Sequence, residues 1–179
     1  MQYYQALDLE PSLTLDADDL QKRFYAASRK WHPDRFSRAS AAEQAEALEM
    51  TAVLNDAFRT LRDPAKRAEY FLAQRGLELS KDAPPELLEE VFELNMALEE
   101  LRAGDSSARA DLEAAHEKFV NMLAETDEAL KSLFAKHDAA EEADQPGVLQ
   151  EIQATLNRRR YVGNLVREVE KELHVDAAN

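Results

Sequence analysis

The sequence of 179 residues contains no cysteine, and it has only four glycines and six prolines. Without cysteine, the chain has no disulfide, no thiolate nucleophile and no cysteine-ligated zinc or iron–sulfur centre. The scarcity of glycine and proline excludes collagen-like and low-complexity chains and argues against an all-β fold with many turns. No apolar run approaches the ~18–20 residues that a membrane-spanning helix needs, so we expect no membrane partner.

Positive charge is also in short supply, since 22 Lys and Arg stand against 36 Asp and Glu, for a net charge of −14. Phosphate backbones require a dense basic surface, which argues against a nucleic-acid partner. The N-terminus has no basic start followed by an apolar stretch, so we expect no secretory signal and a cytoplasmic location.

The charge is distributed unevenly along the chain. Residues 1–76 hold 11 basic and 12 acidic groups, whereas residues 77–179 hold 11 basic and 24 acidic groups. Gly76 and the Pro84-Pro85 pair, neither of which continues a helix, lie where the charge changes. The sequence therefore predicts two domains, residues 1–75 and 86–179, joined by a linker over residues 76–85.

The hydrophobic period is helical almost throughout, which predicts an all-α fold. Asp16 is the expected N-cap of one helix, and Ser40 with Glu43 forms the capping-box pattern at the start of another. We expect the last three helices to form an up-down-up bundle. The predicted helices span residues 3–9, 17–30, 41–61, 65–74, 86–102, 107–140 and 146–174.

The helix predicted over residues 17–30 has two distinct faces. Its apolar residues Leu20, Phe24, Ala27 and Trp31 share one stripe. Its cations lie on an arc roughly 130° away, and a further arginine follows in the loop. This surface is either a solvated charged face or a docking face for an acidic partner. The basic residues concerned are Lys22, Arg23, Arg29, Lys30 and Arg35.

The tripeptide His32-Pro33-Asp34 ends this helix. Pro33 fixes one backbone angle and makes the turn stiff, so that His32 and Asp34 can both project from it. A His/Asp pair can perform acid–base chemistry, and a small hydrolase using these two residues is one alternative function. The sequence offers no oxyanion loop, phosphate-binding glycine loop or metal-ligand spacing to support it, so we expect that the chain is not an enzyme.

These motifs together resemble a J-domain. The resemblance rests on Lys22 to Asp34 and on the stretch from Asn55-Asp56-Ala57-Phe58 to Asp63-Pro64. The forms Trp31-His32-Pro33-Asp34-Arg35-Phe36 and Arg67-Ala68-Glu69-Tyr70-Phe71-Leu72, with an acidic helical tail, more narrowly resemble the HscB-type co-chaperones of iron–sulfur cluster assembly. The resemblance implies an N-terminal J-domain, a helical hairpin with short helices, followed by a three-helix bundle.

The resemblance also implies a partner for the basic helix. That partner is a DnaK-like ATPase chaperone, HscA in this family, whose ATP hydrolysis the J-domain stimulates. His32, Pro33 and Asp34 would be the essential contacts, and Lys22, Arg23, Arg29, Lys30 and Arg35 would supply attraction. Some eukaryotic relatives carry an N-terminal zinc module with paired cysteines. Because this chain has no cysteine, we expect the bacterial type, with no metal and no cofactor.

The helix predicted over residues 86–102 carries two apolar stripes. The first is suited to face the other two helices of the bundle, and it comprises Leu87, Val91, Leu94, Leu98 and Leu101. The second comprises Leu88, Phe92 and Met96 at i, i+4 and i+8, roughly 120–140° from the first. The second stripe either packs on the J-domain or on another helix, or it is an exposed binding site for a client protein.

The HscB resemblance favours a client site, and it implies that the client is the iron–sulfur scaffold protein IscU. The family's apolar contacts fall on Leu88, Phe92 and Tyr161, with Glu93 and Arg160 beside them. The sequence departs from the family pattern at Glu89, where an apolar residue is expected, and at Met96, where an acidic residue is expected. A J-domain adaptor for a different client remains an alternative. The predicted scaffold-binding residues are Leu88, Phe92, Glu93, Met96, Arg160 and Tyr161.

Two further features of the acidic half have structural interpretations. The run Arg158-Arg159-Arg160 is expected to pair with acidic residues of the same domain. The histidines His116, His137 and His174 have no ligand-like spacing, so we expect them on the surface.

Overall fold

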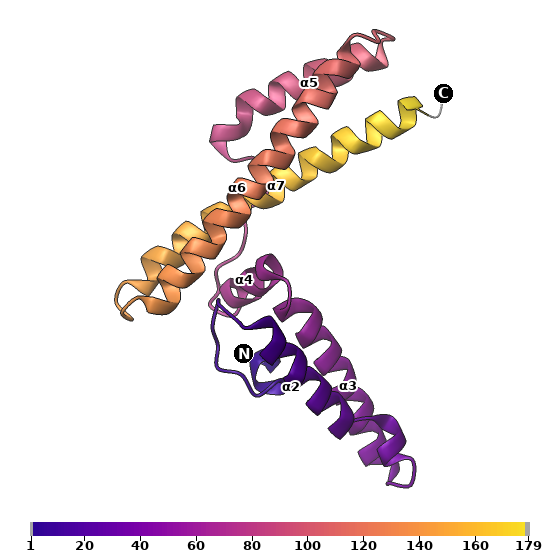
Figure 1. Ribbon diagram of the computed structural model, residues 1–179, viewed down its shortest axis with the longest axis vertical. Coiled ribbons are helices and arrows are strands. Elements are labelled where there is room, and N and C mark those ends of the chain that lie inside the picture. The colour runs from indigo at the N-terminus through magenta and orange to yellow at the C-terminus, as the bar shows by residue number, and fades with distance from the viewer. Residues whose placement is uncertain (1, 178–179) are drawn as a thin grey trace. The chain divides into compact units, whose positions relative to one another are not determined.

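A computed structural model describes the backbone of residues 2–177 and the side chains of residues 2–174. All of its regular elements in this range are helices, which confirms the all-α class (Figure 1). None of the described helices combines the length and the apolar character that crossing a membrane requires. The elements are α1 (Gln2–Ala6), α2 (Ala17–Lys30), η1 (Pro33–Phe36), α3 (Ala41–Leu61), α4 (Pro64–Ala73), η2 (Pro85–Leu87), α5 (Leu88–Arg102), α6 (Ala108–Ala139) and α7 (Gln145–Ala177).

The helix boundaries follow local capping chemistry, as the sequence predicts. The Asp16 carboxylate accepts a hydrogen bond from the Asp19 N–H at 2.8 Å and begins α2. Ser40 and Glu43 form the predicted capping box at the start of α3. Gly76, with φ of +74°, follows α4 in a conformation that side chains with a Cβ rarely adopt.

The chain forms two compact units. The first contains residues 1–78 and 134–149, and the second contains residues 79–133 and 150–179. The turn between α6 and α7 therefore belongs to the first unit, although it lies far along the chain from the other residues of that unit. The division into domains of residues 1–75 and 86–179 stays a prediction.

In the first unit, α2 and α3 lie side by side (Figure 1). Tyr4, Leu20, Leu54 and Phe71 are among the side chains that form its core. Arg67 is buried with them, and it donates from Nε to the Leu13 carbonyl at 2.9 Å and from Nη1 to the Leu61 carbonyl at 2.6 Å. These bonds hold the loop before α2 against the end of α3, although burial lowers the pKa of Arg67.

The prediction that His137 lies on the surface is wrong. Its side chain is only 5% exposed, and its ring meets Phe71 edge-on with 5.3 Å between centroids. The adjacent Asp138 carboxylate accepts hydrogen bonds from Ser12 Oγ at 2.8 Å and from the Thr14 N–H at 2.6 Å. The turn between α6 and α7 is thus anchored to the loop that precedes α2, and this long-range contact is what buries His137.

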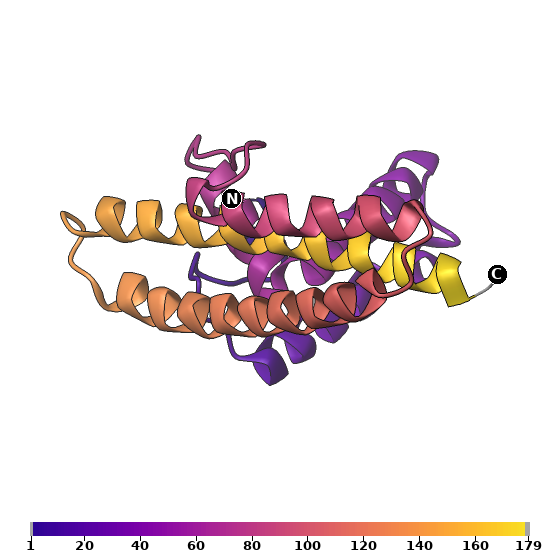
Figure 2. The same cartoon turned by 90° about the horizontal axis from the view of Figure 1, so that it is seen from above.

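The second unit is built on α5 together with the portions of α6 and α7 that belong to it, which run side by side (Figure 2). Its core contains Leu94 and Leu98 of α5, Phe119 of α6 and Val162 of α7, all of them buried. The first apolar stripe of α5 therefore faces the bundle core as predicted. Arg159 pairs with Asp127 of the same unit, as expected for part of the arginine run.

Candidate functional site

The apolar face of α2 determines where its cations lie. Leu20 is buried, and the ring of Phe24 stacks on Phe58 of α3 with 4.3 Å between centroids and 12° between planes. This packing fixes the rotation of α2 about its axis. The residues on the opposite arc, including Lys22, Arg29 and Lys30, are consequently exposed.

Four of the five cations predicted for this surface are uncompensated. Within the described part of the chain, no carboxylate forms an ion pair with Lys22, Arg29, Lys30 or Arg35. Arg23 differs, because Asp19 lies 2.8 Å and Asp8 3.2 Å from its guanidinium. The hydrogen bond from Arg23 to Asp19, followed by its attraction to both carboxylates, raises its pKa. The uncompensated charge therefore gathers at the C-terminal end of α2 and in the turn that follows, whereas Lys22 lies nearer the N-terminal end of the helix.

The His-Pro-Asp turn is a short 3₁₀-helix that starts at a stiff corner. His32 is its N-cap, with Nδ1 accepting from the Asp34 N–H at 3.3 Å, and Pro33 occupies the first position. The side chains of His32 and Asp34 are 58% and 91% exposed, and His32 Nδ1 lies 3.6 Å from Asp34 Oδ2. The turn thus presents an imidazole and a carboxylate to solvent in a fixed arrangement.

Two contacts support the backbone of the turn, one of them from α3. The ring of Trp31 stacks on Phe36 with 5.9 Å between centroids and 7° between planes. The Thr51 hydroxyl donates to the Trp31 carbonyl at 3.1 Å. Because these contacts lie before and after the tripeptide, the exposed side chains are carried on a supported backbone.

A shallow hollow of about 420 Å³ lies beside the turn. It brings together His32, Arg29 and Arg35, and it adds Tyr25 and Ser28, which are not among the residues predicted from the sequence. Tyr25 is 51% exposed. Tyr25 and Arg29 are four residues apart and therefore lie on one face of α2, and this spacing is visible in the sequence.

The groups on this surface are suited to binding. Uncompensated cations attract an acidic partner over about a Debye length. An exposed tyrosine supplies apolar area with a polar tip, as interface residues commonly do. The surface formed by α2 and the His-Pro-Asp turn can therefore recognise an acidic protein surface.

A second candidate surface lies on α5. Leu88, Phe92 and Met96 are 57%, 64% and 48% exposed, so the bundle core does not cover the second apolar stripe. Exposed apolar side chains grouped along a helix mark a site that a partner can cover.

The other predicted residues of this surface differ in exposure. Glu93 is exposed on α5, and one of its carboxylate oxygens lies 3.9 Å from Lys118 Nζ. Arg160 is exposed on α7, whereas Tyr161 is half-buried and packs against the bundle core. Tyr161 can therefore offer only part of its ring to a partner.

Comparisons with known protein families match the two parts of the chain separately. The family model described as the DnaJ domain matches residues 2–70. The model described as the HSCB C-terminal oligomerisation domain matches residues 83–170.

Several curated proteins are similar to this chain. The Co-chaperone protein HscB homolog of Neisseria meningitidis serogroup C (strain 053442) is 38% identical over 110 residues, which are 58% of this chain and 65% of that protein. The Co-chaperone protein HscB homolog of Neisseria gonorrhoeae (strain NCCP11945) is 36% identical over 111 residues, covering 59% and 66% of the two chains. The matched region thus spans slightly less than two thirds of these relatives.

Two solved structures share the fold over almost the whole chain. Chaperone HscB from Vibrio cholerae matches with a TM-score of 0.66 and 29% identity, covering 96% of both chains. Human co-chaperone protein HscB matches with a TM-score of 0.66 and 25% identity, covering 95% of this chain and 81% of the human one. The similarity therefore includes both the N-terminal helices and the bundle.

Proposed function

The chain belongs to the HscB-type J-domain co-chaperones, and on this premise we propose that it binds a DnaK-like ATPase chaperone, HscA in this family, and stimulates its ATP hydrolysis. The observation that carries the proposal is the exposed His32-Pro33-Asp34 corner beside four uncompensated cations. The cations attract an acidic surface of the chaperone, and the stiff corner orients His32 and Asp34 for short contacts.

The chain acts on the hydrolysis without supplying a catalytic group. A partner that binds one conformation of the chaperone more tightly than another shifts its equilibrium by that difference in affinity. His32 and Asp34 make the contacts that distinguish the two conformations. The rate of ATP hydrolysis then rises because the competent conformation is more populated.

The second apolar stripe of α5 binds the client, for which we propose the iron–sulfur scaffold protein IscU. Covering side chains such as Leu88 and Phe92 stabilises a complex by roughly 1.5–3 kcal/mol each, and Glu93 and Arg160 add polar contacts. Binding both partners at once raises the effective concentration of the scaffold at the chaperone. The chain is then a bridge that couples client delivery to ATP hydrolysis.

An ATPase assay of the chaperone tests this function. We expect stimulation by the full chain and a larger, synergistic stimulation when the scaffold protein is added. His32→Gln should abolish the stimulation while leaving scaffold affinity unchanged, because His32 acts only toward the chaperone. Unchanged stimulation by this variant would refute the docking role of the turn.

A further inference from the structure

A pocket of about 310 Å³ lies in the first unit, where the start of α2, the end of α3 and the start of α4 meet. Its volume is at the low end of the ~300–1,000 Å³ that small-molecule sites occupy. Its walls are largely apolar, and they include Leu15, Leu20, Phe58 and Pro64. Leu20 is buried, and Leu15 and Phe58 are half-buried. The pocket can therefore enclose a small apolar group.

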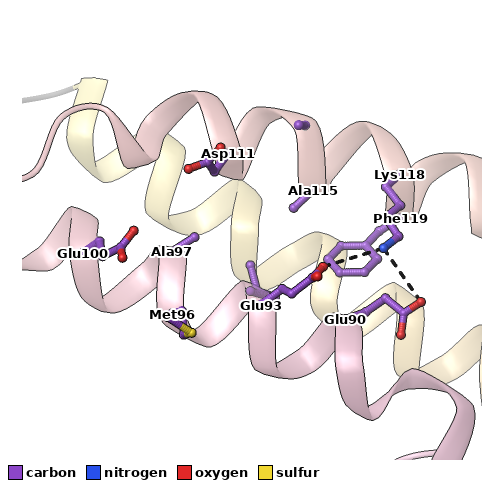
Figure 3. A pocket seen from close by; sticks show the side chains of 11 residues that line it. Glu90, Glu93, Met96, Ala97, Glu100, Asp111, Ala115, Lys118 and Phe119 are labelled. Atoms are coloured by element: carbon purple, nitrogen blue, oxygen red, sulfur yellow. Dashed lines mark ion pairs between the residues drawn. The ribbon is translucent and has the colours of Figure 1, made fainter.

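The charge around this pocket is opposite to that of the chain. Its lining residues include Arg62 and Arg67 and no acidic residue. The groove between α5 and α6 in the second unit is different, because three glutamates, one aspartate and a single cation, Lys118, line it (Figure 3). A chain with a net charge of −14 thus places two guanidinium groups around one cavity. This arrangement favours an anionic ligand.

Arg67 is a buried cation without a counterion. It is 7% exposed, and within the part of the chain that the structure describes no carboxylate forms an ion pair with it. Burial lowers its pKa more than attraction to Asp138 and Asp63, which lie beyond ion-pair distance, raises it. Buried charged side chains are usually paired. A bound anion would supply the counterion that the protein does not.

One terminal nitrogen of Arg67 is available to such an anion. Nε donates to the Leu13 carbonyl and Nη1 to the Leu61 carbonyl, whereas Nη2 has no hydrogen-bond partner among the described residues. The two carbonyls fix the plane of the guanidinium, so its remaining donors are already oriented before a ligand binds. Because Arg67 lines the pocket, a carboxylate inside it can accept from Nη2.

Arg62 supplies a second cation on the solvent side. It is exposed, and its guanidinium carbon lies 5.6 Å from the centroid of the Phe58 ring. This contact restrains the guanidinium beside the pocket. The apolar walls suit a ligand with a hydrocarbon body, and they disfavour phosphate, whose higher charge costs more to remove from water.

We propose that this pocket binds a small carboxylic acid, with a single carboxylate on a compact apolar body. The carboxylate accepts from Arg67 Nη2 and from Arg62, and the body lies against Leu20 and Phe58. The pocket borders the first residues of α2, whereas the His-Pro-Asp turn follows its last residue. The ligand therefore leaves the docking surface for the chaperone uncovered, and it stabilises the first unit because it binds only the folded pocket.

NMR titration of the full chain with 4-methylpentanoate tests the inference. We expect a saturable shift of the Arg67 Nε–H signal and of the backbone amides of Leu20 and Arg62. The neutral isostere 4-methylpentanamide should bind at least about tenfold more weakly, because hydrogen bonds between charged groups are the stronger ones. Acetate should also bind more weakly, since it has no apolar body to bury.

Two variants locate the binding site. Arg62→Gln should weaken binding about three- to tenfold, and Arg59→Gln, at an exposed arginine of α3 outside the pocket, is its control. Ala17→Leu should weaken binding about tenfold or more, because Ala17 lines the pocket and a larger side chain fills the space of the ligand. Ala41→Leu is its control, since Ala41 is likewise exposed and the first residue of its helix. Circular dichroism verifies that the variants are folded.

The outcomes decide the inference in either direction. Tight binding of the acid alone, weakened by Arg62→Gln and Ala17→Leu but not by their controls, would support it. The absence of a saturable shift, or equal affinity for the acid and the amide, would overturn it. Shifts that remain unchanged in both pocket variants would place the binding elsewhere and overturn it as well.

Discussion

At the scale of single residues, exposure separates the side chains that hold this protein together from those available to partners. Phe24 and Phe92 are both phenylalanines at helical positions. Phe24 stacks on Phe58 inside the first unit, whereas Phe92 is 64% exposed on α5. The same contrast distinguishes Arg23, engaged by two carboxylates, from Arg29, which is exposed and has no ion pair within the described residues.

Phe92→Ala should weaken scaffold binding without reducing basal stimulation of the chaperone. Removing an aromatic anchor from an interface typically costs at least about 1 kcal/mol, so we expect a loss of affinity of fivefold or more. Titration of the variant with the scaffold measures this, and circular dichroism verifies that the helices remain. Leu48→Ala, at another exposed apolar residue but on α3, is the matched control and should bind the scaffold normally.

Arg29→Ala should impair chaperone docking more than Arg23→Ala does. The guanidinium of Arg23 cannot contact a partner closely without leaving Asp19 and Asp8, whereas that of Arg29 has no such competitor. The chain concentration that gives half-maximal ATPase stimulation should rise about three- to tenfold for Arg29→Ala and by less for Arg23→Ala. Equal effects would show that total charge alone governs docking.

At the scale of elements, local chemistry determined most of the helix boundaries. The ends of α2 and α3 follow from Asp16, from the Ser40 and Glu43 pair, and from Pro33, because caps and prolines act within one helical turn. The sequence pattern predicts a loop over residues 33–36, yet they form a 3₁₀-helix. Such a short turn has no hydrophobic period by which the sequence could have revealed it.

Ser40→Ala should destabilise the first unit by about 1 kcal/mol, because it removes an N-cap hydroxyl that accepts from the Glu43 N–H at 3.3 Å. Urea unfolding followed by circular dichroism measures the change in the free energy of unfolding. Ser37→Ala is the control, because the Ser37 hydroxyl has no hydrogen bond within the described residues. Similar losses for the two variants would mean that the capping box contributes no special stability.

At the scale of the whole molecule, the two compact units do not follow the order of the chain. Asp138 and His137, near the C-terminal end of α6, belong with residues 12–14 and Phe71. Partial burial acts to raise the pKa of Asp138. Hydrogen bonds from His137, Ser12 and the backbone of Thr14 and Leu13 outweigh this effect and lower the pKa. The charged carboxylate is therefore the form that stabilises this contact.

Asp138→Asn should destabilise the protein by about 1–3 kcal/mol at pH 7, since it leaves N–H and O–H donors of the loop poorly matched. Because the native pKa lies below the unfolded one, the contribution of Asp138 is fully present above about pH 4 and is lost as the pH falls through the native value. The free energies of unfolding of the variant and the wild type, measured at pH 7 and in more acidic buffers, should therefore converge as the pH falls. Asp144→Asn, at an exposed acid of the same turn, should show neither effect, and a constant difference at all pH values would contradict this account of Asp138.

The sequence by itself determined the helices, the exposed His-Pro-Asp turn and the two stripes of α5, because caps, prolines and helical periods act between residues that are close in the chain. Only the tertiary structure decided that His137 is buried, that Arg23 is paired with Asp8 and that α5 and α6 leave an acidic groove between them. Each of these depends on residues that are distant in sequence or on the relative rotation of packed helices. No local pattern records such contacts, since they arise from how side chains fill the space between elements.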